Sequence, residues 1–259
     1  MTRYAYLGPA GTFTEAALRT ISQSSDELLP CSNVTAALDA VRSGNADRAL
    51  VPIENSVEGV VARTLDELAI GEPLVIYGEV TLPVTFSLLV SPGNEFDAAI
   101  AAPIAAETYS LATVALNIGD NDGAVTRFVL VGKPGSVPSP TGHDRTSLAA
   151  FIGADHAGAL LEVLTEFSVR GVNLTFIQSR PTGRELGHYH FIIDAEGHIN
   201  DERVGDALMG LRRICEDVRY LGSYPRADKV APTTTSATAD SSFIEADSWL
   251  AAVRAGKKI

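Results

Sequence analysis

The sequence is poor in cysteine and in positive charge. Only Cys31 and Cys215 occur among 259 residues, and neither belongs to a Cys/His pattern with the spacing of a zinc site. This excludes a disulfide framework, and we expect reduced thiols and no metal. The 32 acidic residues outnumber the 20 basic ones, for a formal net charge of -12. Such a charge opposes binding to nucleic acid or to an anionic membrane surface.

Long apolar runs are also missing. No run reaches the length needed to span a membrane, and the first residues enter a strand pattern without the apolar region of a signal peptide. We therefore expect a cytoplasmic protein. The composition, 46% hydrophobic and 20% charged, is typical of a globular chain with one large or two modest domains.

Residues 1–133 alternate between strand and helix patterns. Apolar runs at 4–7 and 48–53 end in polar or glycine-rich loops, and helical spacing appears at 12–21 and 34–41. This order predicts an α/β layer with a mostly parallel sheet. Ligands of such sheets bind beyond the carboxyl ends of the strands, so we expect the loops after Leu7 and Ile53 to face one crevice. Further predicted elements are strands at 75–90, 96–101 and 125–131 and a helix at 104–116.

The rest of the chain predicts a separate domain. Residues 133–142 hold three prolines and two glycines, a linker composition. We place a first domain at 1–133, the linker at 134–142 and a second domain at 143–226, whose βαββαβ order predicts a ferredoxin-like sandwich. For the tail, 227–259, we expect disorder at 232–242 and then a short amphipathic helix.

The loop from Gly8 to Gly11 opens a helix, so free backbone N–H groups and the positive end of the helix would face an anion such as a substrate carboxylate. The alternative is a tight turn that binds nothing. The loop lacks the Gly-Lys-Ser/Thr of a Walker-type phosphate site.

Polar residues also interrupt two apolar strand patterns. Thr126 and Arg127 lie between apolar neighbours, where a charge needs a partner or access to water; the alternative is a pair facing solvent on an edge strand. Glu54 is a candidate proton donor if burial raises its pKa, or else a carboxylate paired with an arginine. Asn55 and Ser56 would bind a substrate oxygen or cap the next helix.

His188 and His190, two apart on a predicted strand, would share a face and could suit a metal, but no third ligand is evident. We interpret them as surface residues.

Four patterns resemble prephenate dehydratases, in the same order along the chain. They are YLGPAGTFT at 6–14, VPIENS at 51–56 with Gly59, VTRF at 125–128, and GALL at 158–161 with NLT at 173–175 and SRP at 179–181. The resemblance implies a two-lobed, periplasmic-binding-protein-like catalytic domain followed by an ACT domain that binds phenylalanine. It also implies conversion of prephenate to phenylpyruvate with loss of water and carbon dioxide, without a cofactor.

The resemblance also implies roles for individual residues. Thr126 would act at the departing hydroxyl and Arg127 would organise the site. The candidate catalytic set is Glu54, Asn55, Ser56, Thr126, Arg127 and Phe128. The candidate substrate-binding set is Pro9, Gly11, Thr12 and Gly59. The candidate phenylalanine-binding set is Gly158, Ala159, Leu160, Leu161, Asn173, Leu174, Gln178, Ser179 and Arg180. Gln178 stands where the family commonly has Glu, which would alter the affinity for the effector.

One departure from the family lies between Gly93 and Asn94, where a second-lobe segment of about fifty residues is missing by comparison with an ordinary α/β lobe. Either the segment is omitted from the sequence or the protein lacks it. Without it we expect the strands at 80–90 and 96–101 to expose an apolar face.

Alternative functions are an impaired, amino-acid-binding regulatory protein and an arogenate dehydratase. A periplasmic solute-binding protein fits poorly, because it would need a signal sequence and has no ACT domain. We expect a homodimer or homotetramer, because ACT units usually bury a sheet face or edge against each other.

Overall fold

The computed structural model describes residues 1–153, 156–183 and 189–257, with side chains left out at 94–96. His188, considered above as a metal ligand, lies outside these ranges. The chain divides into two compact units, Met1–Ser136 and Val137–Ile259, and the division falls inside the predicted linker. Among the described helices, none is both long and apolar enough to cross a membrane.

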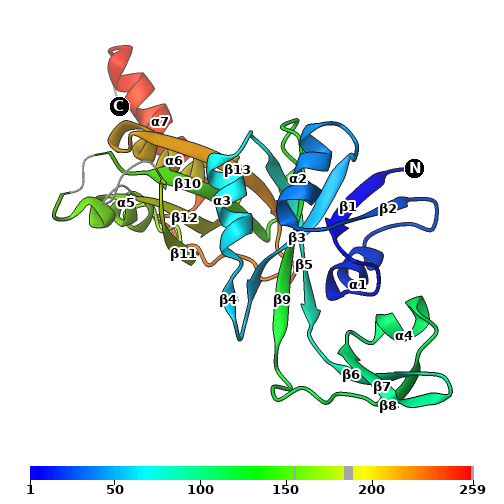
Figure 1. The fold of residues 1–259 in the computed structure, drawn as a ribbon. Coiled ribbons are helices and arrows are strands. Elements are labelled where there is room, and N and C mark those ends of the chain that lie inside the picture. Colours follow the sequence, from blue (N-terminus) through cyan, green and yellow to red (C-terminus); the bar gives the residue numbers. More distant parts are fainter. Residues whose placement is uncertain (154–155, 184–188, 258–259) are drawn as a thin grey trace. The chain divides into compact units, whose positions relative to one another are not determined.

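Six strands of the first unit form one mixed sheet (Figure 1), with the order β2-β1-β3-β9-β5 and with β4 paired to β3. β1 is parallel to β2 and β3, whereas β9 is antiparallel to β3 and β5. The sheet is therefore parallel on one side only, and the prediction of a mostly parallel sheet is wrong, because β9 returns between β3 and β5 in the opposite direction. The carboxyl ends of β1 and β3 and the start of β9 therefore share one edge. The bounds are β1 Arg3–Leu7, β2 Glu27–Cys31, β3 Arg48–Asn55, β4 Gly59–Val60, β5 Val75–Pro83 and β9 Val125–Gly132.

Three helices cover this sheet: α1 Phe13–Arg19, α2 Val34–Arg42 and α3 Ala62–Ile70. Side chains cap the first two, since Thr12 Oγ1 accepts from the Glu15 N–H at 3.4 Å and Asn33 Oδ1 accepts from the Ala36 N–H at 2.9 Å. The apolar positions of α2 follow the spacing of one helix face and are buried. A core cluster under α1 consists of Tyr6, Ala17, Leu18, Leu50 and Phe128.

A second, smaller sheet forms the other lobe of the first unit, with the order β7-β6-β8 and all pairs antiparallel. Its elements are β6 Ser87–Ser91, β7 Asn94–Ala101, α4 Ile104–Thr108 and β8 Ala112–Ala115. The short connection at Gly93 makes a hairpin, with proline before a glycine at φ +83°, the geometry of a type II turn. Two segments join the lobes and bond to each other: the Val84 N–H donates to Ala124 O at 2.7 Å and the Ile118 N–H to Phe86 O at 2.9 Å.

Two predictions for this lobe are wrong. The strand expected over 75–90 is broken between β5 and β6, and the helix expected over 104–116 ends at Thr108. Ser110 at φ +53° turns the chain, and β8 then pairs with β6. The edge of β6 offers β8 backbone hydrogen bonds, and the β-branched Thr113 and Val114 favour a strand, so tertiary pairing prevails over helix propensity.

The second unit has the predicted βαββαβ order and the sheet order β11-β12-β10-β13 of a ferredoxin-like fold. Its elements are β10 Asp144–Phe151, α5 Ala159–Ser168, β11 Leu174–Pro181, β12 Tyr189–Glu196, α6 Glu202–Ile214 and β13 Asp217–Pro225. Figure 1 shows α5 and α6 beside this sheet, and their apolar residues share a core with it. The core comprises Leu148, Ala150, Val163, Phe167, Val172, Ile193, Ala195, Val204, Ala207 and Leu211.

The tail is more ordered than expected. Residues from Asp240 to Ser242, predicted as disordered, begin the helix α7, Asp240–Arg254. Asp240 Oδ1 accepts from the Glu202 N–H at 3.1 Å and so caps α6 from outside that helix.

Candidate active site

Asn55 and Thr126 meet at the sheet edge where β3 ends and β9 begins. They are register partners, and Asn55 Nδ2 donates to Thr126 Oγ1 at 2.8 Å. The other end of the amide is fixed, because Asn55 Oδ1 accepts from the N–H groups of Val57 at 2.8 Å and Glu58 at 3.0 Å. The amide nitrogen must therefore face Thr126, whose oxygen accepts this bond and whose own proton remains to be donated elsewhere.

Arg127 lies between two carboxylates. Its Nε is 3.3 Å from Glu54 Oε2 and its Nη1 is 3.3 Å from Glu79 Oε2. The Arg127 and Glu79 side chains are buried, whereas that of Glu54 is 40% exposed. Glu54 thus occupies the arginine-paired state that we gave as the alternative to a proton donor, and Glu79, which the sequence analysis did not identify, is the buried partner.

Consecutive residues of a strand point to opposite faces, which divides the predicted catalytic set. Thr126 and Phe128 share one face of β9, and Arg127 projects from the other. Phe128 is 1% exposed and belongs to the core under α1, and its place in the catalytic set stays a prediction.

Ser56 and Gly59 shape the turn that follows β3. The Ser56 N–H donates to Val125 O and Ser56 Oγ accepts from the Val125 N–H, both at 2.9 Å, which extends the pairing of β3 with β9. Gly59 pairs with Asn55 and has φ +84°, a conformation that favours glycine. Ser56 therefore neither caps a helix nor leaves its hydroxyl oxygen free of a donor.

The loop after β1 differs from the expected anion cradle. The Gly11 N–H, which we expected to face a substrate anion, donates to Glu15 Oε2 at 2.5 Å. The Glu15 carboxylate thus accepts the hydrogen bond that we expected a substrate carboxylate to accept. Thr12 caps α1 and its hydroxyl donates to Leu7 O at 3.2 Å, while Pro9 is exposed.

Glu15 is a buried carboxylate that contacts the loop after β1 and was not predicted. It is 4% exposed, and Oε1 accepts from Arg19 Nη2 at 2.6 Å. Burial, together with the charge and hydrogen bond of Glu15, raises the pKa of Tyr6 to about 12, so the Tyr6 phenol stays protonated at neutral pH. A glutamate in the first turn of a helix is common as an exposed residue, so its position in the sequence does not indicate burial.

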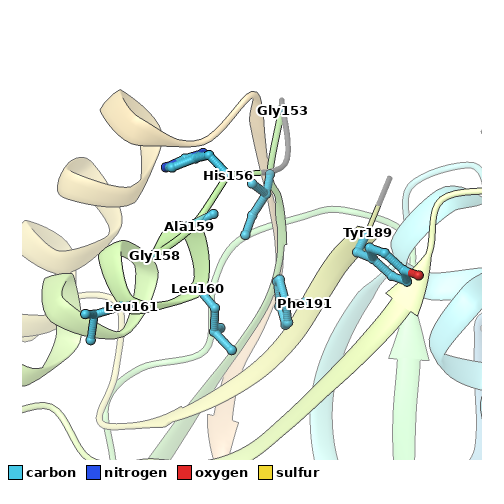
Figure 2. A pocket seen from close by; sticks show the side chains of 9 residues that line it. Gly153, His156, Gly158, Ala159, Leu160, Leu161, Tyr189 and Phe191 are labelled. Atoms are coloured by element: carbon cyan, nitrogen blue, oxygen red, sulfur yellow. The ribbon is translucent and has the colours of Figure 1, made fainter. Parts of the chain in front are cut away.

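In the second unit, part of the predicted effector set lines a pocket of about 210 Å³. Gly158, Ala159, Leu160 and Leu161 border it at the start of α5, where Gly158 has φ +96°. The sequence analysis did not identify the other lining residues, Ile152, Gly153, His156, Tyr189 and Phe191. Figure 2 shows Leu160 on the side of α5 nearest Phe191, so the pocket has an apolar wall.

The rest of that set lies on or just before β11 and does not line this pocket in the described chain: Asn173, Leu174, Gln178, Ser179 and Arg180. β11 is an edge strand that pairs with β12 alone among the described strands. His190 is buried and its ring stacks on Phe151 at 5.0 Å between ring centroids, so it is not the surface residue that we expected.

Across the described ranges, no group of three or more His, Cys, Asp or Glu residues is placed to hold a metal ion. On one face of the sheet edge lie an oriented hydroxyl and the amide that orients it, and on the other face Arg127 is held between two carboxylates. An oriented hydroxyl can hold an oxygen atom and stabilise charge that develops on it.

Fold and site together define a two-unit α/β protein, in which a two-lobed site-bearing unit precedes a ferredoxin-like unit. The family model for prephenate dehydratase matches residues 4–98, and the ACT domain model matches residues 149–213. The prephenate dehydratase of Amycolatopsis methanolica is 44% identical over an alignment that covers 100% of both chains. The chain belongs to the prephenate dehydratase family.

The chain is also similar in structure to solved proteins. Prephenate dehydratase from Arthrobacter aurescens in complex with L-Phe superposes with a TM-score of 0.91 at 43% identity, covering 97% of this chain and 99% of that one. GqqA, described as a novel type of quorum-quenching acylase, superposes with a TM-score of 0.75 at 26% identity, covering 86% and 97%. Proteins with this fold are thus described with different activities, so the function has to be argued from the residues of the site.

The alignment with the Amycolatopsis relative runs over 304 positions, 45 more than the 259 residues of this chain. The relative therefore has residues at positions where this chain has none. This surplus is close in size to the segment that we consider missing after Gly93.

Proposed function

We propose that this protein is a prephenate dehydratase that converts prephenate to phenylpyruvate, carbon dioxide and water without a cofactor, and that phenylalanine regulates it. The observation that carries the proposal is the Asn55–Thr126 hydrogen bond at the sheet edge, in a chain 44% identical to a relative named for this activity. A cytoplasmic location is part of the proposal.

The reaction needs a charge-stabilising donor more than it needs a strong acid. The bond between the ring and its carboxylate breaks, and carbon dioxide leaves. The electron pair moves through the ring and expels the ring hydroxyl, and the ring becomes aromatic. The departing hydroxide takes up one proton to become water, so a donor beside that oxygen lowers the barrier.

Thr126 is the residue suited to this task. Its oxygen accepts from Asn55 Nδ2, which leaves its proton for the departing oxygen. A threonine hydroxyl is too weak an acid to be deprotonated at neutral pH, so Thr126 donates a hydrogen bond and a water supplies the proton. Glu54 is paired with Arg127 on the opposite face of the sheet, which is why we no longer assign it the proton.

The remaining residues would line the substrate site or support it from behind. Pro9 and Gly59 are exposed at the ends of the loops after β1 and β3, and Thr12 stands at the start of α1. Arg127, held between Glu54 and Glu79, would act through its charge on the sheet edge. Ser56 would contribute by fixing the strand pair.

Turnover of prephenate by the purified protein tests the function. Formation of phenylpyruvate, followed by its absorbance, supports it, and arogenate in a parallel assay tests the alternative substrate. If neither substrate is converted while phenylalanine still binds, the protein is the regulatory, catalytically impaired alternative.

Regulation by phenylalanine would use two copies of the chain. The pocket at Gly158–Leu161 has an apolar wall for a ring, and Asn173 is exposed at the start of the edge strand β11. In a two-fold dimer each chain supplies one of these sets to a shared site, so their separation within one chain is consistent with a site between subunits. Light scattering should show a dimer or tetramer at micromolar concentration; a monomer would contradict this part of the proposal.

The substitution Asn173→Ala tests the effector site. We expect the variant to lose its response to phenylalanine, measured against its own turnover without phenylalanine. Coupling between effector and active site is typically about 1 to 3 kcal/mol, so wild-type inhibition should be partial or cooperative. The control Asn200→Ala changes another exposed asparagine of the second unit and should retain the response. Plain competition with prephenate that survives in the Asn173 variant would remove the ACT domain as the sensor.

A further inference from the structure

The loop after β1 is fixed at a single peptide group. The Gly11 N–H donates to Glu15 Oε2 at 2.5 Å, and the Ala10 carbonyl accepts from the Tyr109 hydroxyl at 2.7 Å. These two atoms belong to the same peptide bond. Both its donor and its acceptor are therefore occupied by side chains, which sets the orientation of the peptide plane.

The two side chains come from different lobes of the first unit. Glu15 is in α1 on the six-stranded sheet, and Tyr109 ends α4 in the small lobe. Gly11 leaves no room for a larger residue, because an added Cβ would lie 2.9 Å from Tyr109 Cε2 and 3.2 Å from Ala105 Cα. Gly11 therefore lies directly against the small lobe.

Glu15 is itself held in place. Its other carboxylate oxygen accepts from Arg19 Nε at 3.0 Å and from Nη2 at 2.6 Å, and the carboxylate contributes to the raised pKa of Tyr6. Donors from Gly11 and Arg19 thus bind both oxygens of the carboxylate, which keeps it in one position. The loop that it holds starts at the carboxyl end of β1, the neighbour of β3, which carries Asn55.

We propose that Glu15 and Tyr109 are positioning residues, which together fix the Ala10–Gly11 peptide and so set the loop against the substrate in the dehydratase reaction. This inference rests on the proposed function. Neither residue takes part in bond breaking. Loss of either should weaken substrate binding through the loop, so the Michaelis constant should change and the turnover number should not.

The substitution Tyr109→Phe removes only the hydroxyl oxygen, and with it the hydrogen bond to Ala10 O. A matched control exists in the same unit: Tyr77 also donates to a backbone carbonyl, Lys133 O, at the same 2.7 Å, but at the far end of the six-stranded sheet. We expect Tyr109→Phe to raise KM for prephenate roughly three- to tenfold, the equivalent of one neutral hydrogen bond, with kcat within about twofold. Tyr77→Phe should change neither.

Hydrogen–deuterium exchange gives a readout that is independent of turnover. The Gly11 amide, in a peptide covering residues 6–18, should exchange several-fold faster in Tyr109→Phe than in the wild type or in Tyr77→Phe. Unchanged exchange would show that Tyr109 does not fix the loop. Faster exchange with unchanged KM, or a fall in kcat alone, would also overturn the positioning role.

Glu15 is tested by two substitutions of similar size. Glu15→Gln keeps an oxygen for the Gly11 N–H and should retain most of the affinity for prephenate, whereas Glu15→Met removes it and should raise KM at least as much as Tyr109→Phe. Equal behaviour of the two variants would contradict the role of Glu15. If the wild-type protein does not convert prephenate, the proposed function fails, and exchange at Gly11 still decides whether the two residues fix the loop.

Discussion

The two sheets of the first unit differ in how completely they are covered. The six-stranded sheet lies under α1, α2 and α3, and its Leu50, Val51 and Ile76 are fully buried. The three-stranded sheet has one short helix beside it and leaves large apolar residues exposed: Ile100 at 66%, Val114 at 59% and Leu116 at 70%.

The candidate catalytic contacts and the expected stability both differ between the two sheets. The candidate catalytic contacts, between Asn55 and Thr126 and around Arg127, all belong to the covered sheet, where packing holds strands in place. The small lobe contributes Tyr109 at the end of α4, which reaches the loop of the other lobe. Its sheet buries the hydroxyl of Ser87 without a hydrogen-bond partner among the described residues. A small apolar core and a buried unpaired hydroxyl both lower the stability of the small sheet.

The largest expected effect is on the stability of the covered sheet. Leu50→Ala should lower the free energy of unfolding by about 2–5 kcal/mol, because it leaves a cavity in a closed core. Leu89→Ala, at an equally buried position of the small sheet, should cost no more than about half as much, since we expect that less covered sheet to open locally. Urea denaturation of both variants measures the difference, and equal costs would show that the two sheets unfold as one.

Thr126→Ala comes next and should lower turnover by a factor of about a hundred or more, or about 2.7 kcal/mol, while leaving the fold intact. Thr126→Ser keeps the hydroxyl and should retain much of the activity. Steady-state rates measure the turnover, and circular dichroism shows whether the fold is intact. Near-wild-type turnover in the alanine variant would remove Thr126 from the mechanism and the chemistry from this sheet edge.

The orientation of the Thr126 hydroxyl should depend on Asn55. Asn55→Ala removes the donor and should lower kcat roughly tenfold, the upper end of one neutral hydrogen bond. Asn55→Asp places an acceptor 2.8 Å from Thr126 Oγ1, so the threonine proton would turn toward it and away from the substrate. Activity should therefore fall further in the aspartate variant, and a ranking in the opposite order would mean that the hydroxyl is not oriented this way.

The smallest expected effect is on the bare face of the small sheet. Ile100→Thr and Val114→Thr should each change the free energy of unfolding by less than about 0.5 kcal/mol, because both side chains are exposed. Thermal unfolding measures this. A cost of about 2 kcal/mol would mean that another segment or another copy covers the face, and the contrast between the sheets would then be smaller than the structure suggests.

The sequence predicts the elements of the second unit better than those of the small lobe. In the second unit each strand and helix has its own apolar period and a complete set of neighbours, so pattern and packing agree and all elements appeared in the expected order. In the small lobe, residues 112–115 have no apolar period that predicts a strand. Their strand exists because β6 has a free edge, and an edge created by tertiary structure is invisible in a local pattern.

The candidate site was predictable in part. Family motifs marked Thr126, Asn55 and Arg127, but the contact between Asn55 and Thr126 joins residues 71 apart, and only the antiparallel return of β9 brings them together. Phe128 was included as part of the VTRF pattern, and core packing buries it. Glu15, Glu79 and Tyr109 act through partners that the sequence does not show.

The paired segments between β5 and β6 and between β8 and β9 have a mechanical consequence. A single connection would let the small lobe swivel freely, but two connections joined by the Val84–Ala124 and Ile118–Phe86 hydrogen bonds form a ribbon. Because the two connections are bonded to each other, any rotation of the small lobe must bend both of them together. The hydrogen bond from the Tyr109 hydroxyl to Ala10 O joins the lobes at a separate place, so such a rotation would also have to break it.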